Sequence, residues 1–205
     1  MSKYPILTVD ELAIGRENAL SNARELVQEA KVLLDHTFFA RAIFLSSIAG
    51  EEIGKYLLLS GSIYMLIAGK LHWKSFWKSF RSHAHKLKSI MITEILLSPP
   101  TGADEKRKDM AEMKQVARAL ERGKQLSLYV DHVEGAFRIP SENFTEEMAQ
   151  DAIRWAEGRI AMTCRIEEVY AYKAPEAWTK DDVNKIKSAI EEIRQGPEDK
   201  ECPPV

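Results

Sequence analysis

The fold is decided by the stretch TFFARAIFLSSIAGEEIGKYLLLSGSIYMLIAG, residues 37–69. Its pattern predicts a helix that follows Thr37, ends near Ala68 and has Gly69 as its C′ residue. Apolar side chains occupy most faces of this helix, so we expect other helices to surround it. Its most apolar run covers 13 residues, 56–68, whereas a bilayer span needs about 20 apolar residues. We therefore expect a buried core helix and no contact with a membrane.

The composition is that of an ordinary globular domain. Of 205 residues, 45% are hydrophobic and 29% are charged, which excludes a disordered tail, a collagen-like repeat and a disulfide scaffold. The net charge of −2 means that any attraction to nucleic acid must be local. Residues 1–10 hold no apolar targeting segment, and the chain has two cysteines, Cys164 and Cys202. We expect no structural disulfide and a cytoplasmic location.

The pattern is helical on both sides of the central stretch. A capping box of Thr8 and Glu11 starts a helix that runs to about Asp35. The other predicted elements are helices from Trp73 to just before Pro99, over 104–130 and over 145–173, a loop at 134–143, a shorter helix at 179–196 and a flexible tail at 197–205. The sequence thus predicts an all-α bundle of five long helices plus a shorter C-terminal helix. Residues 1–196 would form a single domain.

Small residues form a stripe along the central helix. The stripe begins at Ser47 and continues 3, 7 and 14 residues later with Gly50, Gly54 and Gly61. At these spacings the four residues lie on one side of a helix. Glycine inside a helix costs about 0.5–1 kcal/mol relative to alanine. We therefore expect another backbone to pack very close to this stripe.

Charged side chains interrupt the same apolar helix. Glu51 and Lys55 are four residues apart, in the favourable order for an ion pair. Arg41 lies eleven residues before Glu52, about three turns, so these two share a side. Charges in such a helix must be paired or lie near water. Two interpretations stay open: a structural ion network, or a functional site built around Glu51, Glu52 and Lys55.

The next predicted helix is basic and aromatic. No carboxylate occurs between Glu52 and Glu94. On a continuous helix one stripe would carry Lys74, Lys78, Arg81, His85 and Lys88. Such a stripe is typical of a surface that contacts phosphates. A solvent-exposed face whose cations pair with acidic side chains on other helices explains it equally well. His83 falls on the apolar side, where it can be a hydrogen-bonded core group or, beside Glu51 or Glu52, an acid–base group held in one tautomer.

Several common catalytic motifs are missing. The chain has no Gly-rich phosphate loop, no Gly-x-Ser-x-Gly elbow and no Cys-x-x-Cys pair. No Glu-x-x-His occurs, so a ferritin-like di-iron bundle has no ligand set. We therefore expect no cofactor and no metal.

Four segments together resemble one known family. They are Arg41-Ala42, the run AGEEIGK at 49–55, the run FRSHAHKL at 80–87, and LYVD at 128–131 followed by Pro140. This set, spread over roughly residues 10–170, is similar to the AbiV abortive-infection family of the HEPN superfamily. The resemblance implies an α-helical HEPN-type bundle, commonly a homodimer, in bacterial phage defence.

Many HEPN proteins are metal-independent ribonucleases that use an Arg-x4–6-His motif. This sequence departs from that pattern, because no arginine has a histidine five to seven residues later. Lys78 and His85 have the spacing, but with lysine in place of arginine. The polar set is therefore open to a role in folding or in binding RNA or protein.

The leading hypothesis is an AbiV-type phage-defence effector that acts on RNA or the translation apparatus. As a ribonuclease it would use His83 for proton transfer, Arg81 and Lys86 for the phosphate charge, and Glu51 or Glu52 to orient the imidazole. The residues expected to contact RNA are Lys74, Lys78, His85 and Lys88. The alternative is a binding module without chemistry that contacts a phage protein or a toxin–antitoxin partner, and the missing motif favours it.

Overall fold

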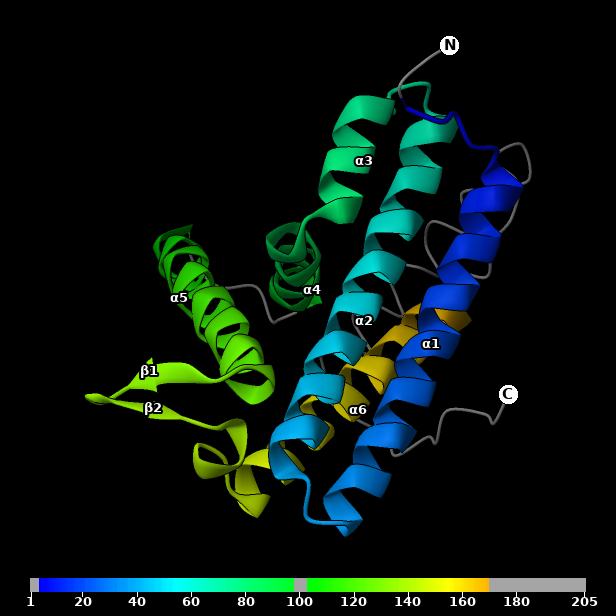
Figure 1. Ribbon diagram of the computed structural model, residues 1–205. Coiled ribbons are helices and arrows are strands. Elements are labelled where there is room, and N and C mark those ends of the chain that lie inside the picture. The colour runs from blue at the N-terminus through cyan, green and yellow to red at the C-terminus, as the bar shows by residue number, and fades with distance from the viewer. Residues whose placement is uncertain (1–3, 98–102, 170–205) are drawn as a thin grey trace.

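The computed structural model describes residues 4–97 and 103–169, and these form an all-α bundle (Figure 1). The all-α class expected from the sequence is confirmed. In chain order the elements are α1 (Val9–Asp35), α2 (Phe39–Ile67), α3 (Trp73–Arg81), α4 (His83–Leu97), α5 (Ala103–Leu128), β1 (Asp131–Val133), β2 (Ala136–Arg138), a 3-10 turn (Pro140–Glu142) and α6 (Glu146–Val169).

The first two helices form an antiparallel pair along the length of the molecule (Figure 1). The capping box predicted for α1 is present, since the Thr8 hydroxyl accepts from the Glu11 N–H and the Glu11 carboxylate accepts from the Thr8 N–H. Thr37 turns the chain into α2 with a φ of 63°. Gly69 follows the last residues of α2 with a φ of 65°, as a helix C′ residue requires.

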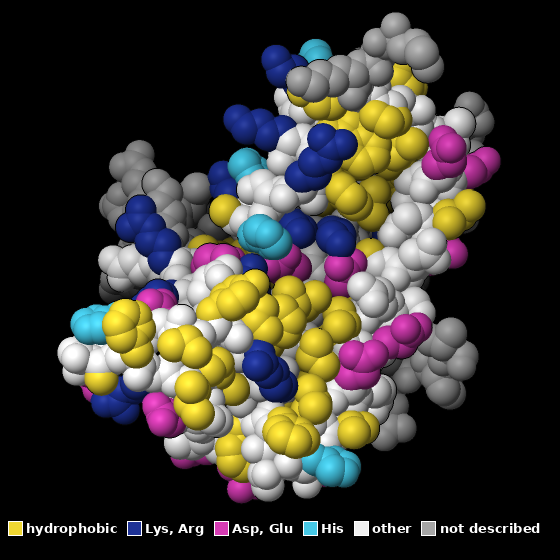
Figure 2. Space-filling view, viewed as in Figure 1, with side chains coloured by type: hydrophobic (Ala, Val, Ile, Leu, Met, Phe, Trp, Pro, Cys, Tyr) yellow, Lys and Arg dark blue, Asp and Glu magenta, His cyan; other side chains and the backbone are white. Residues whose placement is uncertain are grey.

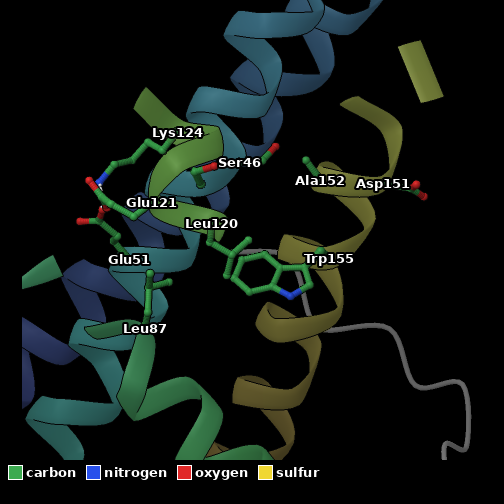
Figure 3. A pocket seen from close by; sticks show the side chains of 10 residues that line it. Ser46, Glu51, Leu87, Leu120, Glu121, Lys124, Asp151, Ala152 and Trp155 are labelled. Carbon is green, nitrogen blue, oxygen red and sulfur yellow. Dashed lines mark hydrogen bonds and ion pairs between the residues drawn. The ribbon is translucent and has the colours of Figure 1, made fainter. Parts of the chain in front are cut away.

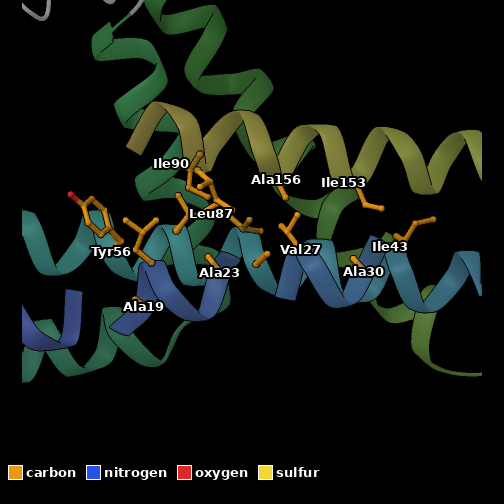
Figure 4. Close-up of a cluster of buried hydrophobic side chains, with 14 of the residues drawn as sticks. Ala19, Ala23, Val27, Ala30, Ile43, Tyr56, Leu87, Ile90, Ile153 and Ala156 are labelled. Atoms are coloured by element: carbon orange, nitrogen blue, oxygen red, sulfur yellow. The ribbon is translucent and has the colours of Figure 1, made fainter. Parts of the chain in front are cut away.

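Helix α2 is the centre of the bundle and packs against α1, α4, α5 and α6. Small side chains on α1 let the two helices approach closely, and α6 closes the same core from the other side (Figure 4). Labelled members of this core are Ala19, Ala23, Val27, Ala30, Ile43, Tyr56, Leu87, Ile90, Ile153 and Ala156. The expectation that neighbouring helices surround α2 is confirmed.

The long helix expected from Trp73 to Pro99 is two helices. At Ser82 the backbone is extended, with φ −91° and ψ 119°, and α3 ends there. The Ser82 hydroxyl accepts from the His85 N–H, so the same residue caps the start of α4. The basic stripe predicted on one continuous helix is therefore divided between two helices with different axes (Figure 1).

The predicted loop at 134–143 contains regular structure. β1 and β2 form an antiparallel hairpin, with Val133 opposite Ala136. Both residues between them have positive φ, 50° at Glu134 and 85° at Gly135, which is the pattern of a type I′ turn. Strands of three residues are too short to show the alternation by which strands are recognised in a sequence.

Several expectations concern residues beyond the described ranges. These expectations are the helix at 179–196, the tail at 197–205 and the end of the helix predicted to reach residue 173.

Cys164 is disulfide-bonded, which contradicts the expectation of no structural disulfide. Within residues 4–97 and 103–169, no helix combines the length and the apolar character needed to cross a bilayer.

Candidate functional site

Glu51 is the hub of a buried polar centre. Glu51 is 4% exposed, and its carboxylate accepts hydrogen bonds from the side chains of three other residues. Lys86 on α4 donates to Oε2 at 2.9 Å, and Lys124 on α5 donates to Oε1 at 2.7 Å. Nδ1 of His83, the first residue of α4, lies 2.5 Å from Oε2. One carboxylate thus joins α2, α4 and α5.

The carboxylate fixes the tautomer of His83. Glu51 is ionised and can only accept, so Nδ1 of the imidazole must carry the proton and donate it. The side chain of His83 is 56% exposed although its partner is buried. In the neutral ring Nε2 is then an unprotonated base, and among the described residues no protein group hydrogen-bonds to it. Such an imidazole can accept a proton from a ligand.

Close packing of α4 on α2 brings His83 and Lys86 to Glu51. A Cβ at Gly54 would overlap the backbone carbonyl of Lys86, so glycine is required for this approach. The close backbone contact expected from the small-residue stripe is confirmed at Gly54. A Cβ at Gly50 would lie 2.5 Å from the Trp155 ring instead of a backbone, and a Cβ at Gly61 would meet nothing within 4 Å.

Lys124 and Glu121 were not predicted from the sequence. Lys124 is 6% exposed, and its ammonium pairs with Glu51 and, at 2.7 Å, with Glu121 one turn earlier. A signal was present, because Lys124 lies between Leu120 and Ser127 on the inward side of α5. A lysine at such a position needs a buried acid. The sequence alone does not say which acid on which helix meets it.

The protonation states follow from these contacts. Burial alone raises the pKa of the Glu51 carboxyl, but the hydrogen bonds from its three donors prevail and lower this pKa from 4.5 to about 2. Burial lowers the pKa of Lys124, yet its hydrogen bonds to Glu121 and Glu51 raise it overall. At neutral pH the centre therefore holds charged carboxylates and charged ammonium groups.

His83 lies on an open groove of about 630 Å³ between α4 and α5. Three cations line the same groove, namely Arg81 before the break, Lys88 on α4 and Arg118 on α5, and all three are exposed. Its apolar wall includes Leu87, Met91 and Ala117. In the space-filling view, histidine, basic and acidic side chains meet near the middle of the molecule, below the basic surface around α3 (Figure 2). An exposed imidazole among cations is suited to an anionic ligand.

Among the described residues, Glu52 and Lys55 make no hydrogen bond or ion pair with His83. Lys55 pairs with Glu52 at 2.5 Å, not with Glu51 as the spacing predicted, and its ammonium lies over the Phe80 ring. Arg41, three turns before Glu52, donates from its guanidinium to the Leu128 carbonyl at 3.1 Å. The predicted pairing of Glu51 with Lys55 is wrong because helical spacing fixes only a face, while the surrounding side chains decide the partner.

The other predicted residues divide between the interior and the surface. Lys86, expected to face phosphate, is 5% exposed and faces Glu51. Lys74 and Lys78 on α3 are exposed, as is Lys88. His85 is exposed too, and its Nδ1 lies 2.8 Å from the Ser82 hydroxyl. Among the described residues, no three His, Cys, Asp or Glu side chains are grouped so that they could hold a metal ion.

The fold and this centre define an α-helical domain in which a buried carboxylate holds an imidazole at the edge of a cationic groove. A family model described as AbiV, of the HEPN type, matches residues 11–161. The chain therefore belongs to the AbiV family of HEPN proteins, as its sequence motifs indicated. Glu51, His83, Lys86 and Lys124 all lie within the matched range. No curated protein and no solved structure gives a significant match to the chain.

Proposed function

We propose that the protein is a cytoplasmic abortive-infection effector that cleaves RNA without a metal. Membership of the AbiV family suggests phage defence, and the polar centre supports the chemistry. The observation that carries the proposal is the 2.5 Å contact between Nδ1 of His83 and Glu51, with the imidazole exposed on a cationic groove. Residues 1–196 would form the effector domain.

His83 supplies the base for the reaction. Its free Nε2 takes the proton of a ribose 2′-hydroxyl, and the 2′ oxygen attacks the adjacent phosphorus. The bond from phosphorus to the 5′ oxygen breaks, and that oxygen takes a proton from water in the open groove. The products are a 2′,3′-cyclic phosphate and a 5′-hydroxyl. Glu51 stabilises the imidazolium that forms, and the hydroxide left by that water takes its Nε2 proton, which restores the neutral ring.

Cations at the groove supply the charge stabilisation. Arg81, Lys88 and Arg118 line the groove that exposes His83 and can neutralise the phosphate. Lys86 and Lys124 act less directly, because both are buried against Glu51 and hold it in place. Lys74, Lys78 and His85 lie on the surface, where they can contact RNA on either side of the cleaved bond.

The two neighbouring histidines allow a matched test. His83 contacts the carboxylate, whereas the ring of His85, two residues on, is exposed and lies beside the Ser82 hydroxyl. Purified protein would be incubated with a defined RNA in EDTA, and cleavage rates and product ends would be measured. We expect His83→Ala to reduce cleavage at least ~100-fold, the lower range for loss of an acid–base group. His85→Ala should change the rate less than about fivefold.

Helical circular dichroism of both variants should equal that of the parent, because both side chains are exposed. Equal cleavage by the parent and His83→Ala would remove this histidine from the chemistry. Cleavage that starts only when a divalent metal is added would contradict the metal-independent mechanism.

A homodimer is part of the proposal. Four large apolar residues in and beside the hairpin are at least half exposed: Tyr129, Val130, Phe137 and Ile139. Such a surface in a protein domain is typical of a protein contact. We expect sedimentation at micromolar concentration to give twice the chain mass of 23.3 kDa. A sedimenting mass equal to one chain would contradict the dimer.

The same surface favours a second candidate function. A binding module without chemistry would act by docking a phage protein or a toxin–antitoxin partner on the hairpin. In that case Phe137→Asp should abolish growth arrest in cells while His83→Ala should leave it intact. The ribonuclease proposal expects His83→Ala to abolish growth arrest.

A further inference from the structure

A second cavity adjoins the groove of His83. It has a volume of about 280 Å³ and lies between α2, α4, α5 and α6. Leu87, Leu120 and Trp155 form apolar walls, and Glu51, Glu121 and Lys124 lie at one end (Figure 3). Mostly apolar cavities with a few convergent polar groups are typical sites for small organic ligands.

The cavity and the groove share two lining residues, Leu87 and Glu121. A phosphate beside His83 would therefore lie next to the cavity that Trp155 lines. Nucleotides have this shape, with a charged phosphate on one side of the sugar and a flat apolar-faced base on the other. Proteins that bind unpaired RNA commonly hold its bases against aromatic and aliphatic side chains.

Most polar groups of the cavity can only accept a hydrogen bond. The Ser46 and Ser47 hydroxyls already donate to backbone carbonyls at 2.9 and 2.8 Å, so only their lone pairs remain. Both carboxylate oxygens of Glu121 accept one bond each, from Lys124 and from Gln125, and retain a further lone pair. Lys124 donates two of its three N–H groups to Glu51 and Glu121.

The aromatic wall adds no donor at the polar end. The indole nitrogen of Trp155 lies on the side of its ring away from Glu121 and Lys124 (Figure 3). The end of the cavity nearest His83 is therefore rich in acceptors and offers at most one N–H, from Lys124, whose Nζ also lies 3.5 Å from Nδ1 of His83. An exocyclic amino group offers two donors to such a site, whereas the carbonyl at the same position of uracil offers none.

We propose that this cavity holds an RNA base beside the cleaved phosphate and selects a base with an exocyclic amino group. The part that concerns cleavage rests on the proposed function, but the base preference is a binding property that can be measured without catalysis. Cytosine and uracil are the matched pair of bases, since they share the pyrimidine ring. Cytosine has an amino group at C4 and an acceptor at N3, whereas uracil has a carbonyl at C4 and a single N–H donor at N3.

The test uses two dinucleotides, CpC and UpU, with the 2′-hydroxyl of the first ribose methylated so that it cannot attack. Their binding to the full chain would be measured by titration calorimetry, with inorganic phosphate as the ligand that lacks a base. We expect CpC to bind about tenfold more tightly than UpU, the effect of one hydrogen bond to a charged group. Equal affinities, tighter UpU, or no binding of either dinucleotide at millimolar concentration would overturn the proposal.

Variants show where the base binds. Ala152 lines the cavity from α6, and Ala152→Leu should weaken CpC at least tenfold by filling the space. Gly158→Leu on the same helix is the control, because a Cβ there meets nothing within 4 Å. Glu121→Gln keeps the shape of the side chain and should reduce the preference for CpC to below threefold. An unchanged preference in both cavity variants would place the base elsewhere and refute the cavity assignment.

The outcomes separate this inference from the proposed function. Tight, cavity-dependent binding of CpC by a protein that cleaves no RNA would sustain the cavity and reject the nuclease. Cleavage that depends on His83, without any base preference in binding, would sustain the nuclease and reject the cavity.

Discussion

Replacing Glu51 by glutamine tests whether one carboxylate holds the centre together. Glutamine keeps the size of the side chain but removes the charge that neutralises two buried ammonium groups. The side chains of Lys86 and Lys124 are 6% and 7% exposed. Lys124 would keep Glu121 as a partner, whereas Lys86 pairs only with Glu51 among the described residues.

The expected loss follows from the buried lysine that remains without an anion. Breaking a buried ion pair by removing one partner costs about 3–5 kcal/mol. Because Lys124 keeps Glu121, we expect Glu51→Gln to lower the free energy of unfolding by about 3 kcal/mol. For a chain of this size that corresponds to a fall in Tm of about 6–12 °C.

The pH dependence gives an independent measure of the same charge. The pKa of Glu51 is 4.5 when unfolded and about 2 when folded, a difference worth about 3 kcal/mol. Since the folded pKa is the lower one, this stability is fully present above pH 5. It is lost as the pH falls from about 4.5 to 2. Glu51→Gln should lack this part of the acid dependence.

Urea unfolding followed by circular dichroism measures both the loss in the free energy of unfolding and its dependence on pH. The control is Glu157→Gln, which breaks a pair with Lys31 whose two side chains are both more than 40% exposed and should cost at most about 1 kcal/mol. The double variant Glu51→Gln with Lys86→Met should recover most of the loss, because it removes the unpaired cation. A loss below 1 kcal/mol for Glu51→Gln, or no recovery in the double variant, would refute the reasoning.

Three further predictions concern the packing at Gly54, the cap at Ser82 and the cations of the groove. Gly54→Ala should cost at least ~2 kcal/mol in urea unfolding, because its methyl group would overlap the α4 backbone, whereas Gly61→Ala, where space is open, should cost nothing. Ser82→Ala should lower Tm through loss of about 1 kcal/mol of helix capping, and Ser82→Asp should restore it. Arg81→Ala and Lys88→Ala should each weaken RNA binding and reduce the slope of log affinity against log salt by about one, while an unchanged slope would place the phosphates elsewhere.

Local patterns in the sequence were enough for most helices. The capping box at Thr8 and the glycine after α2 mark their ends by side-chain and backbone chemistry within a few residues. The break at Ser82 was missed, since serine is also tolerated inside helices and its role as a cap shows only in its backbone angles. The hairpin was missed because its strands hold three residues each.

The sequence by itself determined the all-α class, the central place of α2 and the presence of Glu51 and His83 as candidates for one site. These follow from periodicity, from the density of apolar residues and from the cost of charge in such a helix. Only the tertiary structure decided that Glu51, not Glu52, holds the imidazole, that Lys86 turns inward and that Lys124 comes from α5. The reason is that helical spacing fixes the direction of a side chain, whereas its partner depends on how closely a second backbone approaches, here over Gly54.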